Sequence, residues 1–139
     1  MIKEFQGEYR WLSNFAPVKV VYDGVSYRSV EHAYMAAKSL DEEWRKYCRD
    51  TFKAGDVKRA SRNIVLRDDW EDIKLNVMES LLWQKYTQHP YKQQLLNTGD
   101  EYIQEGNMWG DKYWGVCLRT NKGQNHLGSI IMRIRENLS

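Results

Sequence analysis

The stretch Asp69–Tyr86, DWEDIKLNVMESLLWQKY, carries the clearest helical pattern in the chain. Its apolar side chains recur at intervals of three and four residues, which places them on one face of a helix. This stripe consists of Trp70, Ile73, Val77 and Leu81, flanked by Met78 and Leu82. We therefore expect a long central helix over residues 69–86.

On the N-terminal side of this helix, the sequence predicts a β-hairpin followed by three helices. Two short β-rich runs within residues 18–28 flank Asp23-Gly24, a dipeptide that is favoured in two-residue hairpin turns. Ser29 is a suitable N-cap for the apolar helical stripe that follows it. The expected helices cover residues 30–40, 41–51 and 56–63, the last one capped by Asp56 and separated from its predecessor by Gly55.

On the C-terminal side, the sequence predicts shorter elements and a terminal helix. A short helix over 91–96 is followed by two strands, 102–104 and 113–118, which bracket a loop. A helix entered through Gly123-Gln124-Asn125 closes the chain, with an apolar stripe formed by Leu127, Ile130, Ile131, Ile134 and Leu138. Helices dominate beside a small sheet, so the expected class is a mostly helical α+β fold in a single domain over residues 1–139.

The composition is that of a water-soluble globular protein. Charged residues make up 29% of the 139 residues, hydrophobic ones 42%, and the mean hydropathy is −0.75. No apolar run approaches the roughly 20 residues that span a bilayer, and the N-terminus lacks the features of a signal peptide. Cys48 and Cys117 are far apart and are expected to be reduced thiols in the core. These features predict a cytoplasmic protein without a membrane partner.

Charge and aromatic content are compatible with a ligand that is both anionic and flat. The net charge is +2 and the pI is near 8.5, which tolerates an anion without requiring nucleic acid. Six Trp and nine Tyr provide rings that suit core packing as well as stacking on bases or sugars.

Glu31 and Lys38 form the first candidate site. They are seven residues apart on the helix predicted over 30–40, on one shoulder of its apolar stripe. The spacing fits an exposed pair on a solvated face. It also fits a carboxylate half buried under aromatic rings, where desolvation would raise its pKa and make it useful as an acid or base.

The segment Glu105–Gly115, EGNMWGDKYWG, forms the second candidate site. It combines two further acids, an amide, two indoles and three glycines. Glycines permit close backbone approach to a ligand, and indoles stack on rings and exclude water. Turn glycines and core tryptophans would explain the same composition without a ligand.

Other classes of site have little support in the sequence. His32, His89 and His126 lack metal-ligand spacing with one another or with the cysteines, so we expect no metal and no cofactor. Motifs of phosphate loops, dinucleotide folds and serine hydrolases are absent from the sequence. The helix start at Asn125 would present free N–H groups, which could bind a phosphate.

Five segments taken in order resemble the YbiA-like, or NADAR, family of N-glycosidases. They are Trp11–Pro17, Glu31–Lys38, Asp69–Met78, Glu105–Gly115 and Gly123–Arg135. The resemblance covers almost the whole chain and implies a mostly helical α+β fold with N-glycoside hydrolysis. Implied substrates are ribosylaminopyrimidine phosphates of riboflavin synthesis, or ADP-ribose attached to a guanine-type base, either free or within nucleic acid.

The resemblance also implies the residues of the pocket. By motif position, Glu31, Trp70, Asp111 and Trp114 match family pocket residues, and Glu31 and Asp111 are the expected catalytic carboxylates. Substrate binding is assigned to Asn14, Lys38, Arg62, Trp70, Glu105, Asn107, Trp109, Trp114 and Asn125. Ala33 and Met35 stand where the family often has Tyr and Gln, which bears on the choice of substrate.

The expected mechanism follows from the charges that develop when a ribose C1–N bond breaks. Asp111 is assigned to activating water and offsetting oxocarbenium charge, and Glu31 to recognising or protonating the base, although the two roles could be exchanged. The tryptophans would stack on the base or sugar, while Lys38, Arg62 and the helix start at Asn125 would hold phosphate. A non-catalytic module that binds ADP-ribose or nucleotide ends is the main alternative, and a purely structural helical protein is the third.

Overall fold

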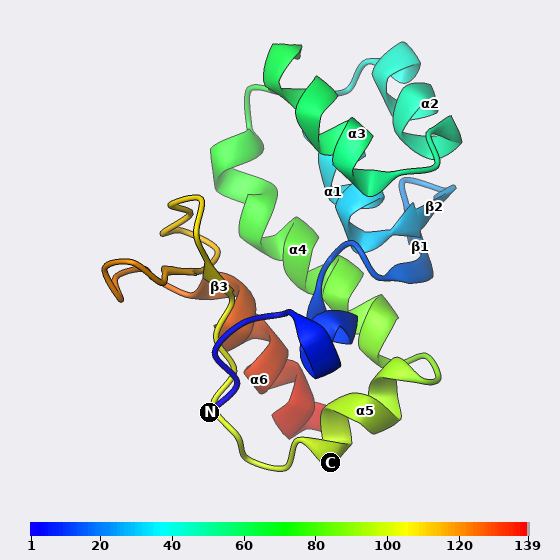
Figure 1. Ribbon diagram of the computed structural model, residues 1–139. Coiled ribbons are helices and arrows are strands. Elements are labelled where there is room, and N and C mark those ends of the chain that lie inside the picture. The colour runs from blue at the N-terminus through cyan, green and yellow to red at the C-terminus, as the bar shows by residue number, and fades with distance from the viewer. Residues whose placement is uncertain (139) are drawn as a thin grey trace. The chain divides into compact units, whose positions relative to one another are not determined.

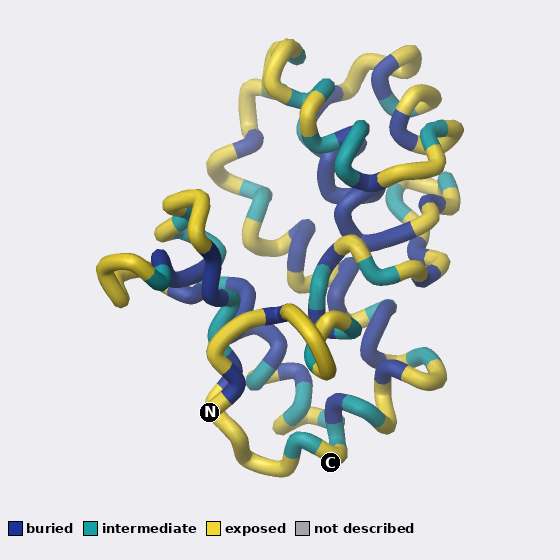
Figure 2. Tube along the Cα trace, in the orientation of Figure 1, coloured by how far each residue is buried: buried dark blue, intermediate teal, exposed yellow. Residues whose placement is uncertain are grey.

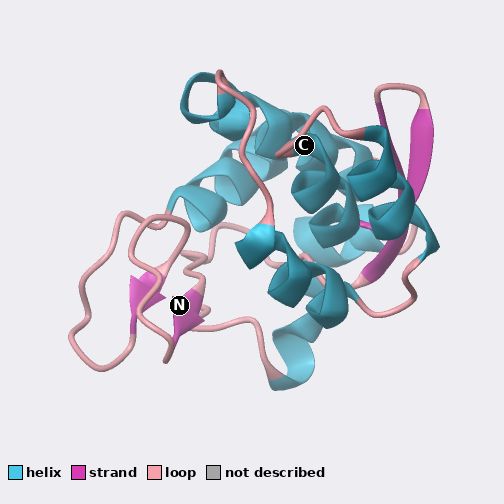
Figure 3. Ribbon diagram, turned by 90° about the horizontal axis from the view of Figure 1, so that it is seen from above, coloured by secondary structure: helices cyan, strands magenta, loops and turns pink. Residues whose placement is uncertain are grey.

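Helices and 3-10 turns make up about half of residues 1–138, the part of the chain that the computed structural model describes. The strands form two separate two-stranded sheets, drawn in magenta in Figure 3. The predicted α+β class is therefore confirmed. The chain divides into two compact units: the hairpin unit, Asn14–Lys85, and the loop unit, which combines Met1–Ser13 with the residues from Tyr86 onward.

The hairpin unit is built on the predicted β-hairpin. Strands β1 (Pro17–Tyr22) and β2 (Val25–Ser29) pair antiparallel. The turn between them places Asp23 at φ 47° and Gly24 at φ 79°. Positive φ at both positions is what a type I′ turn requires, and it explains why Asp-Gly stands there.

Helix α1 (Val30–Ala37) is the core helix of this unit. It contacts both strands of the hairpin as well as α2 (Glu42–Asp50) and α3 (Ala54–Ala60), as Figure 1 illustrates. Every residue of α1 is buried, so the helix appears as a continuous dark blue segment in Figure 2. The apolar stripe after Ser29 thus identified this helix correctly, although the helix ends at residue 37 and not near 40.

The predicted N-cap of the third helix is wrong. Helix α3 begins at Ala54 with Lys53 at the N-cap, and Asp56 lies inside its first turn. The Asp56 N–H already bonds to the Lys53 carbonyl, so Gly55 is part of the helix and does not separate two of them. A 3-10 turn, η2 (Ser61–Asn63), follows.

Helix α4 (Trp70–Tyr86) confirms the long helix predicted over 69–86. Its stripe is buried at Trp70, Val77, Met78, Leu81 and Leu82, whereas Ile73 is partly exposed. The periodic pattern was therefore a reliable guide to the buried face of this helix.

The loop unit contains η1 (Gly7–Leu12), α5 (Tyr91–Asn97) and α6 (His126–Leu138), and α5 packs on α6. Its sheet is a parallel pair of β3 (Gly106–Asn107) and β4 (Val116–Cys117). The strand predicted over 102–104 is only a single bridge between Ile103 and Ile2, and β3 lies inside the predicted loop. A partner 101 residues away in the chain leaves no local signal, which is why this prediction failed.

Both cysteines are buried and neither forms a disulfide, as expected for core thiols. None of the described helices combines the length and the apolar character needed to cross a bilayer.

Candidate functional site

The first turn of α1 buries an acidic side chain. Glu31 is only 6% exposed, so the alternative of an exposed pair on a solvated face does not hold for this residue. Ser29 caps the helix by accepting a hydrogen bond from the His32 N–H at 3.1 Å, and the Glu31 N–H donates to the Asn14 carbonyl at 3.0 Å. A carboxylate in the first turn also interacts favourably with the helix dipole.

Lys38, at the C-cap of α1, joins Glu31 in an aromatic environment. Its Nζ lies 5.7 Å from the centre of the Tyr34 ring, and that ring lies 5.1 Å from the ring of Trp70 at the start of α4. Burial lowers the pKa of Lys38, and the Glu31 carboxylate opposes that shift. The structure therefore brings Glu31, Lys38 and Trp70 together, and it adds Tyr34.

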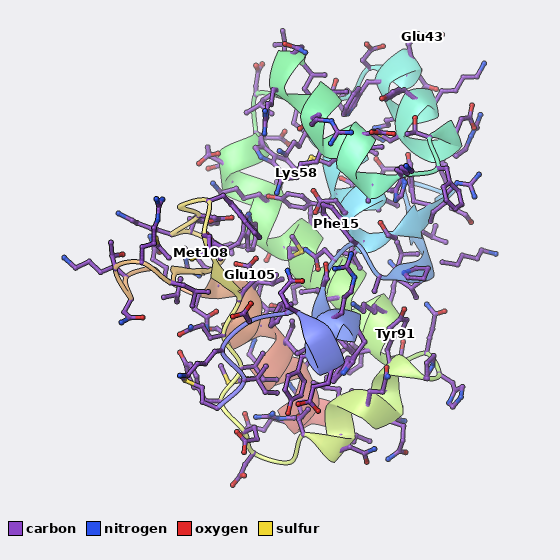
Figure 4. All side chains as sticks on the ribbon, in the orientation of Figure 1. Phe15, Glu43, Lys58, Tyr91, Glu105 and Met108 are labelled. Carbon is purple, nitrogen blue, oxygen red and sulfur yellow. The ribbon has the colours of Figure 1, made fainter. Side chains whose placement is uncertain are left out.

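Two further lysines, which the sequence did not single out, lie within electrostatic range of Lys38. The charges of Lys58 on α3 and Lys74 on α4 both contribute to lowering the pKa of Lys38. The Lys58 Nζ lies 5.9 Å from the centre of the Phe15 ring, and both residues are labelled in Figure 4. Three different helices supply these ammonium groups, so no spacing in the sequence could have revealed the cluster.

Asn14 lies next to Glu31 through the backbone bond described above. Its side chain is 8% exposed, and its amide nitrogen is 3.5 Å from the sulfur of Met78. The side-chain oxygen is buried, and within residues 1–138 it has no hydrogen-bond partner. A buried acceptor of this kind can take a donor from a ligand or from water.

Arg62 is not joined to this group by any contact. It is exposed on η2, and it makes no hydrogen bond or ion pair in the part of the chain that the structure describes. Its assignment to phosphate binding thus has less structural support than that of Lys38.

His32, beside Glu31, is a core histidine. One ring nitrogen lies 2.7 Å from the Ser29 hydroxyl and the other 2.9 Å from the Thr51 carbonyl. Burial lowers its pKa. Among the described residues, no group of three or more His, Cys, Asp or Glu side chains could hold a metal ion.

In the loop unit, Asp111 shapes the Glu105–Gly115 segment. Its Oδ1 accepts hydrogen bonds from the backbone N–H groups of Tyr113 and Trp114, both at 3.0 Å. Within residues 1–138, Oδ2 accepts no hydrogen bond, so it is the oxygen that can engage water or a ligand. The side chain therefore combines a structural role with an available acceptor.

Glu105 is held by two asparagines. Asn107 donates to its Oε2 at 3.0 Å, and the side-chain oxygen of Asn125 accepts from its backbone N–H at 3.0 Å. Gly115 lies directly against this residue, because a Cβ there would clash with both the carboxylate and the carbonyl oxygen of Glu105. This close approach requires glycine at position 115.

The indoles of the loop differ in exposure. Trp109 is 60% exposed, next to the exposed Met108. Trp114 is partly buried and meets the ring of Tyr113 edge-on at 5.0 Å, while Tyr113 packs 4.5 Å from His126 of α6. Trp109 thus has the surface expected of a stacking residue, and Trp114 belongs to a small aromatic cluster.

The start of α6 differs from the prediction of free N–H groups. The amides from Gln124 to Leu127 donate to carbonyls between Lys112 and Gly115 at 2.7–3.3 Å. The Asn125 side chain is equally engaged, because it donates to the Ile103 carbonyl and accepts from Glu105. The helix start supports the loop, and these amides are not available to a phosphate.

Most of the predicted site residues thus form two groups, one in each unit, while Arg62 and Trp109 stand outside them. In the hairpin unit, Glu31 is grouped with Asn14, Lys38 and Trp70. In the loop unit, Asp111 is grouped with Glu105, Asn107, Trp114 and Asn125.

Comparison with known proteins identifies the family of the chain. The NADAR domain family matches residues 2–139. A protein named N-glycosidase YbiA in Escherichia coli K12 is 34% identical over 135 residues, which covers 95% of this chain and 83% of that protein. A riboflavin biosynthesis protein of Vibrio vulnificus is 34% identical over 131 residues, covering 92% of this chain and 35% of that protein.

A solved structure gives the same result for the fold. The NMR structure of E. coli YbiA superimposes with a TM-score of 0.84 at 32% identity, covering 99% of this chain and 86% of that one. Because the family match spans nearly the whole chain and the fold agrees, the chain belongs to the NADAR domain family.

Proposed function

We propose that the protein is an N-glycosidase that hydrolyses the bond between ribose C1 and a nitrogen base in a phosphorylated ribosyl compound. The observation that carries this proposal is the buried Glu31 carboxylate, which lies beside Lys38 and the Tyr34–Trp70 ring pair. An ionisable group enclosed by rings and ammonium groups is typical of a reaction centre. The relatives named N-glycosidase support the reaction type.

The chemistry requires groups that respond to opposite charges. Cleavage of the C1–N bond builds positive charge on the sugar and negative charge on the departing base. A carboxylate offsets the first and activates water, and a proton donor assists the second. The proposed carboxylates are Glu31 and Asp111.

We assign Asp111 to the water and the sugar. Two backbone N–H groups fix its Oδ1, which leaves Oδ2 in a defined direction as an acceptor for a water proton. Glu31 is assigned to the base, which it would recognise or protonate. Trp70, Trp109 and Trp114 are proposed to stack on the base or the sugar.

The phosphate is assigned to the lysine cluster of the hairpin unit. The charges of Lys58 and Lys74 both disfavour the charged form of Lys38, and an anion bound beside Lys38 would oppose that effect. Lys74 also pairs with Glu71 of its own helix at 2.8 Å. Arg62 is a further proposed ligand. We place no phosphate at the start of α6, because its amides already bond to carbonyls of the loop.

Two substrate classes fit this arrangement: a ribosylaminopyrimidine phosphate, and ADP-ribose linked to a guanine-type base, free or within nucleic acid. We propose a cytoplasmic location, since two buried thiols without a disulfide fit a reducing compartment. To test the function, both substrates are offered in parallel and the release of a reducing sugar is measured. Release from at least one substrate is expected, and no release from either would contradict the proposal.

The second candidate function is a binding module for ADP-ribose or nucleotide ends. The exposed Trp109 and the lysine cluster favour it, because both are features of a recognition surface. Calorimetric titration with ADP-ribose measures affinity and the assay for released reducing sugar measures turnover, and the two measurements together separate the functions. Glu31→Gln in an enzyme keeps affinity and loses turnover, whereas a binding module shows no turnover even in the unmodified protein.

A further inference from the structure

Asn107 contacts both acidic residues of the Glu105–Gly115 segment. Its side-chain nitrogen donates to Glu105 Oε2 at 3.0 Å and to the Asp111 carbonyl at 2.9 Å. Its side-chain oxygen accepts from the Asp111 N–H at 2.9 Å. One side-chain amide therefore holds the Glu105 carboxylate on one side and both backbone polar groups of Asp111 on the other.

The backbone of Asn107 is itself fixed. It lies in β3, paired with Cys117 of β4, and its carbonyl accepts from the Leu118 N–H at 2.8 Å. The side chain is only 2% exposed. The strand pairing and burial thus fix the position of Asn107, and its side-chain hydrogen bonds orient the loop.

The three hydrogen bonds can be made only by an amide of this length. A carboxylate in its place would set an acceptor against Glu105 Oε2 and the Asp111 carbonyl, and an apolar residue would remove all three hydrogen bonds. Because Asn107 fixes the backbone N–H and carbonyl of Asp111, it also sets the direction of the carboxylate that accepts from Tyr113 and Trp114.

We propose that Asn107 is a positioning residue, which orients the Glu105 and Asp111 carboxylates toward the substrate without contacting the substrate itself. This inference rests on the proposed N-glycosidase function. It replaces the substrate-binding role expected for Asn107, since both polar atoms of its side chain are engaged within the loop. Glu105 then acts beside Asp111 as an oriented acceptor, for instance for a ribose hydroxyl.

The pH profile of Asn107→Asp provides the test. The retained oxygen still accepts from the Asp111 N–H, but the new oxygen repels Glu105. When one proton binds between the two carboxylates, the lost donor is restored. At pH 8, we expect kcat of Asn107→Asp to be about 100-fold below kcat of the unmodified protein. The ratio of the two kcat values should recover at least tenfold by pH 5.5. KM should change less than kcat.

Apart from position 107, the charged groups of the loop unit are the same in Asn107→Asp and in the unmodified protein. Lys112 lies on the loop, and His126 of α6 packs on Tyr113. Their effects cancel in the ratio of variant to unmodified protein. Asn137→Asp, on α6, is the matched control because its amide donates only to a helix carbonyl, and its pH profile should match that of the unmodified protein.

Melting temperatures recorded at each pH separate orientation from folding. Recovery of kcat in a protein that is folded at every pH supports the proposal. Recovery that merely follows the folded fraction, or a profile parallel to that of the unmodified protein, overturns it. If the unmodified protein hydrolyses neither substrate, the proposed function fails, and this inference fails with it.

A measurement on the unmodified protein keeps the test decisive if Asn107→Asp does not fold. With ribose 5-phosphate bound, the side-chain NH₂ group of Asn107 should remain protected from hydrogen exchange and show no nuclear Overhauser effect to the sugar. Such an effect from Asn107 to the sugar would make it a substrate-binding residue and overturn the positioning role.

Discussion

At the scale of single residues, the proposed chemistry depends on Glu31 and Asp111, whose surroundings differ. Glu31 is buried among rings and near a lysine, whereas Asp111 is a loop carboxylate with one oxygen fixed by two backbone amides. Two carboxyl groups in unlike environments can take unlike roles in one reaction.

We predict that Glu31→Gln and Asp111→Asn each lower kcat by about 100-fold or more, the usual effect of removing a general acid or base. Both changes keep the shape of the side chain, so the melting temperature should change little. Glu43→Gln is the control, because Glu43 is exposed on α2 and should tolerate the change without loss of turnover. Near-normal turnover in both carboxylate variants would contradict the mechanism.

Lys38→Ala should lower kcat/KM for a phosphorylated substrate much more than kcat/KM for the corresponding dephosphorylated nucleoside. The physical reason is that the Lys38 ammonium attracts the phosphate, whereas the loss of its interaction with Glu31 affects both substrates alike. The measurement is kcat/KM for both substrates, with Lys46→Ala on the exposed face of α2 as the control. Equal losses for the two substrates would exclude the phosphate role of Lys38.

At the scale of elements, the N-cap of α1 stabilises the helix that carries Glu31. Ser29 caps α1 by accepting from the His32 N–H, and its hydroxyl also contacts the His32 ring. We predict that Ser29→Ala lowers the free energy of unfolding by about 1 kcal/mol through the loss of the cap. A further loss is expected because Nδ1 of the buried His32 ring loses its hydrogen bond to the Ser29 hydroxyl.

Denaturant titration of Ser29→Ala checks this value. Asp41→Ala is the matched control, since Asp41 caps α2 in an exposed position and should cost less. A smaller loss for Ser29→Ala than for Asp41→Ala would show that the α1 cap contributes little.

Helix α4 contains a buried lysine that should make stability depend on pH. Burial lowers the pKa of Lys85 from its ordinary 10.5 to about 7. Between these values the unfolded chain binds more protons than the folded one, so the free energy of unfolding rises with pH, by up to about 1.4 kcal/mol per pH unit. Lys85→Met should abolish this rise.

The comparison is made by urea unfolding of both proteins between pH 6.5 and 9.5. The stability of the unmodified protein relative to Lys85→Met should increase across this range. Burial raises the pKa of Tyr86 and Cys48, which affects both proteins alike and cancels in the difference. A difference that does not vary with pH would show that Lys85 titrates normally.

The elements also show how far the sequence could predict the fold. Local patterns identified α1, α4, α6 and the hairpin, because apolar periodicity and turn residues act within a few positions of the chain. The pairing of Ile103 with Ile2, the placement of β3 and the cluster of lysines depend on contacts between distant segments. Burial of Glu31 also depends on such contacts, and its spacing from Lys38 by itself favoured an exposed pair.

At the scale of the whole molecule, the proposed reaction uses side chains and water alone. We predict that EDTA, zinc and magnesium each leave turnover unchanged, because the described residues offer no group of three metal-binding side chains. Turnover with each additive is compared with that in metal-free buffer. Loss of turnover in EDTA that one metal restores would require a different mechanism.

The bonds between the start of α6 and the loop have a consequence for spectroscopy. The amides of His126 and Leu127 donate to the carbonyls of Tyr113 and Trp114, so their partners belong to a different segment from their own helix. Their solvent exchange rates therefore report whether the loop is hydrogen-bonded to the start of α6. Amides deeper in α6, such as that of Ile131, report only on the helix. The exchange rates of these two backbone amides, measured by NMR, therefore report how often the loop opens during ligand exchange.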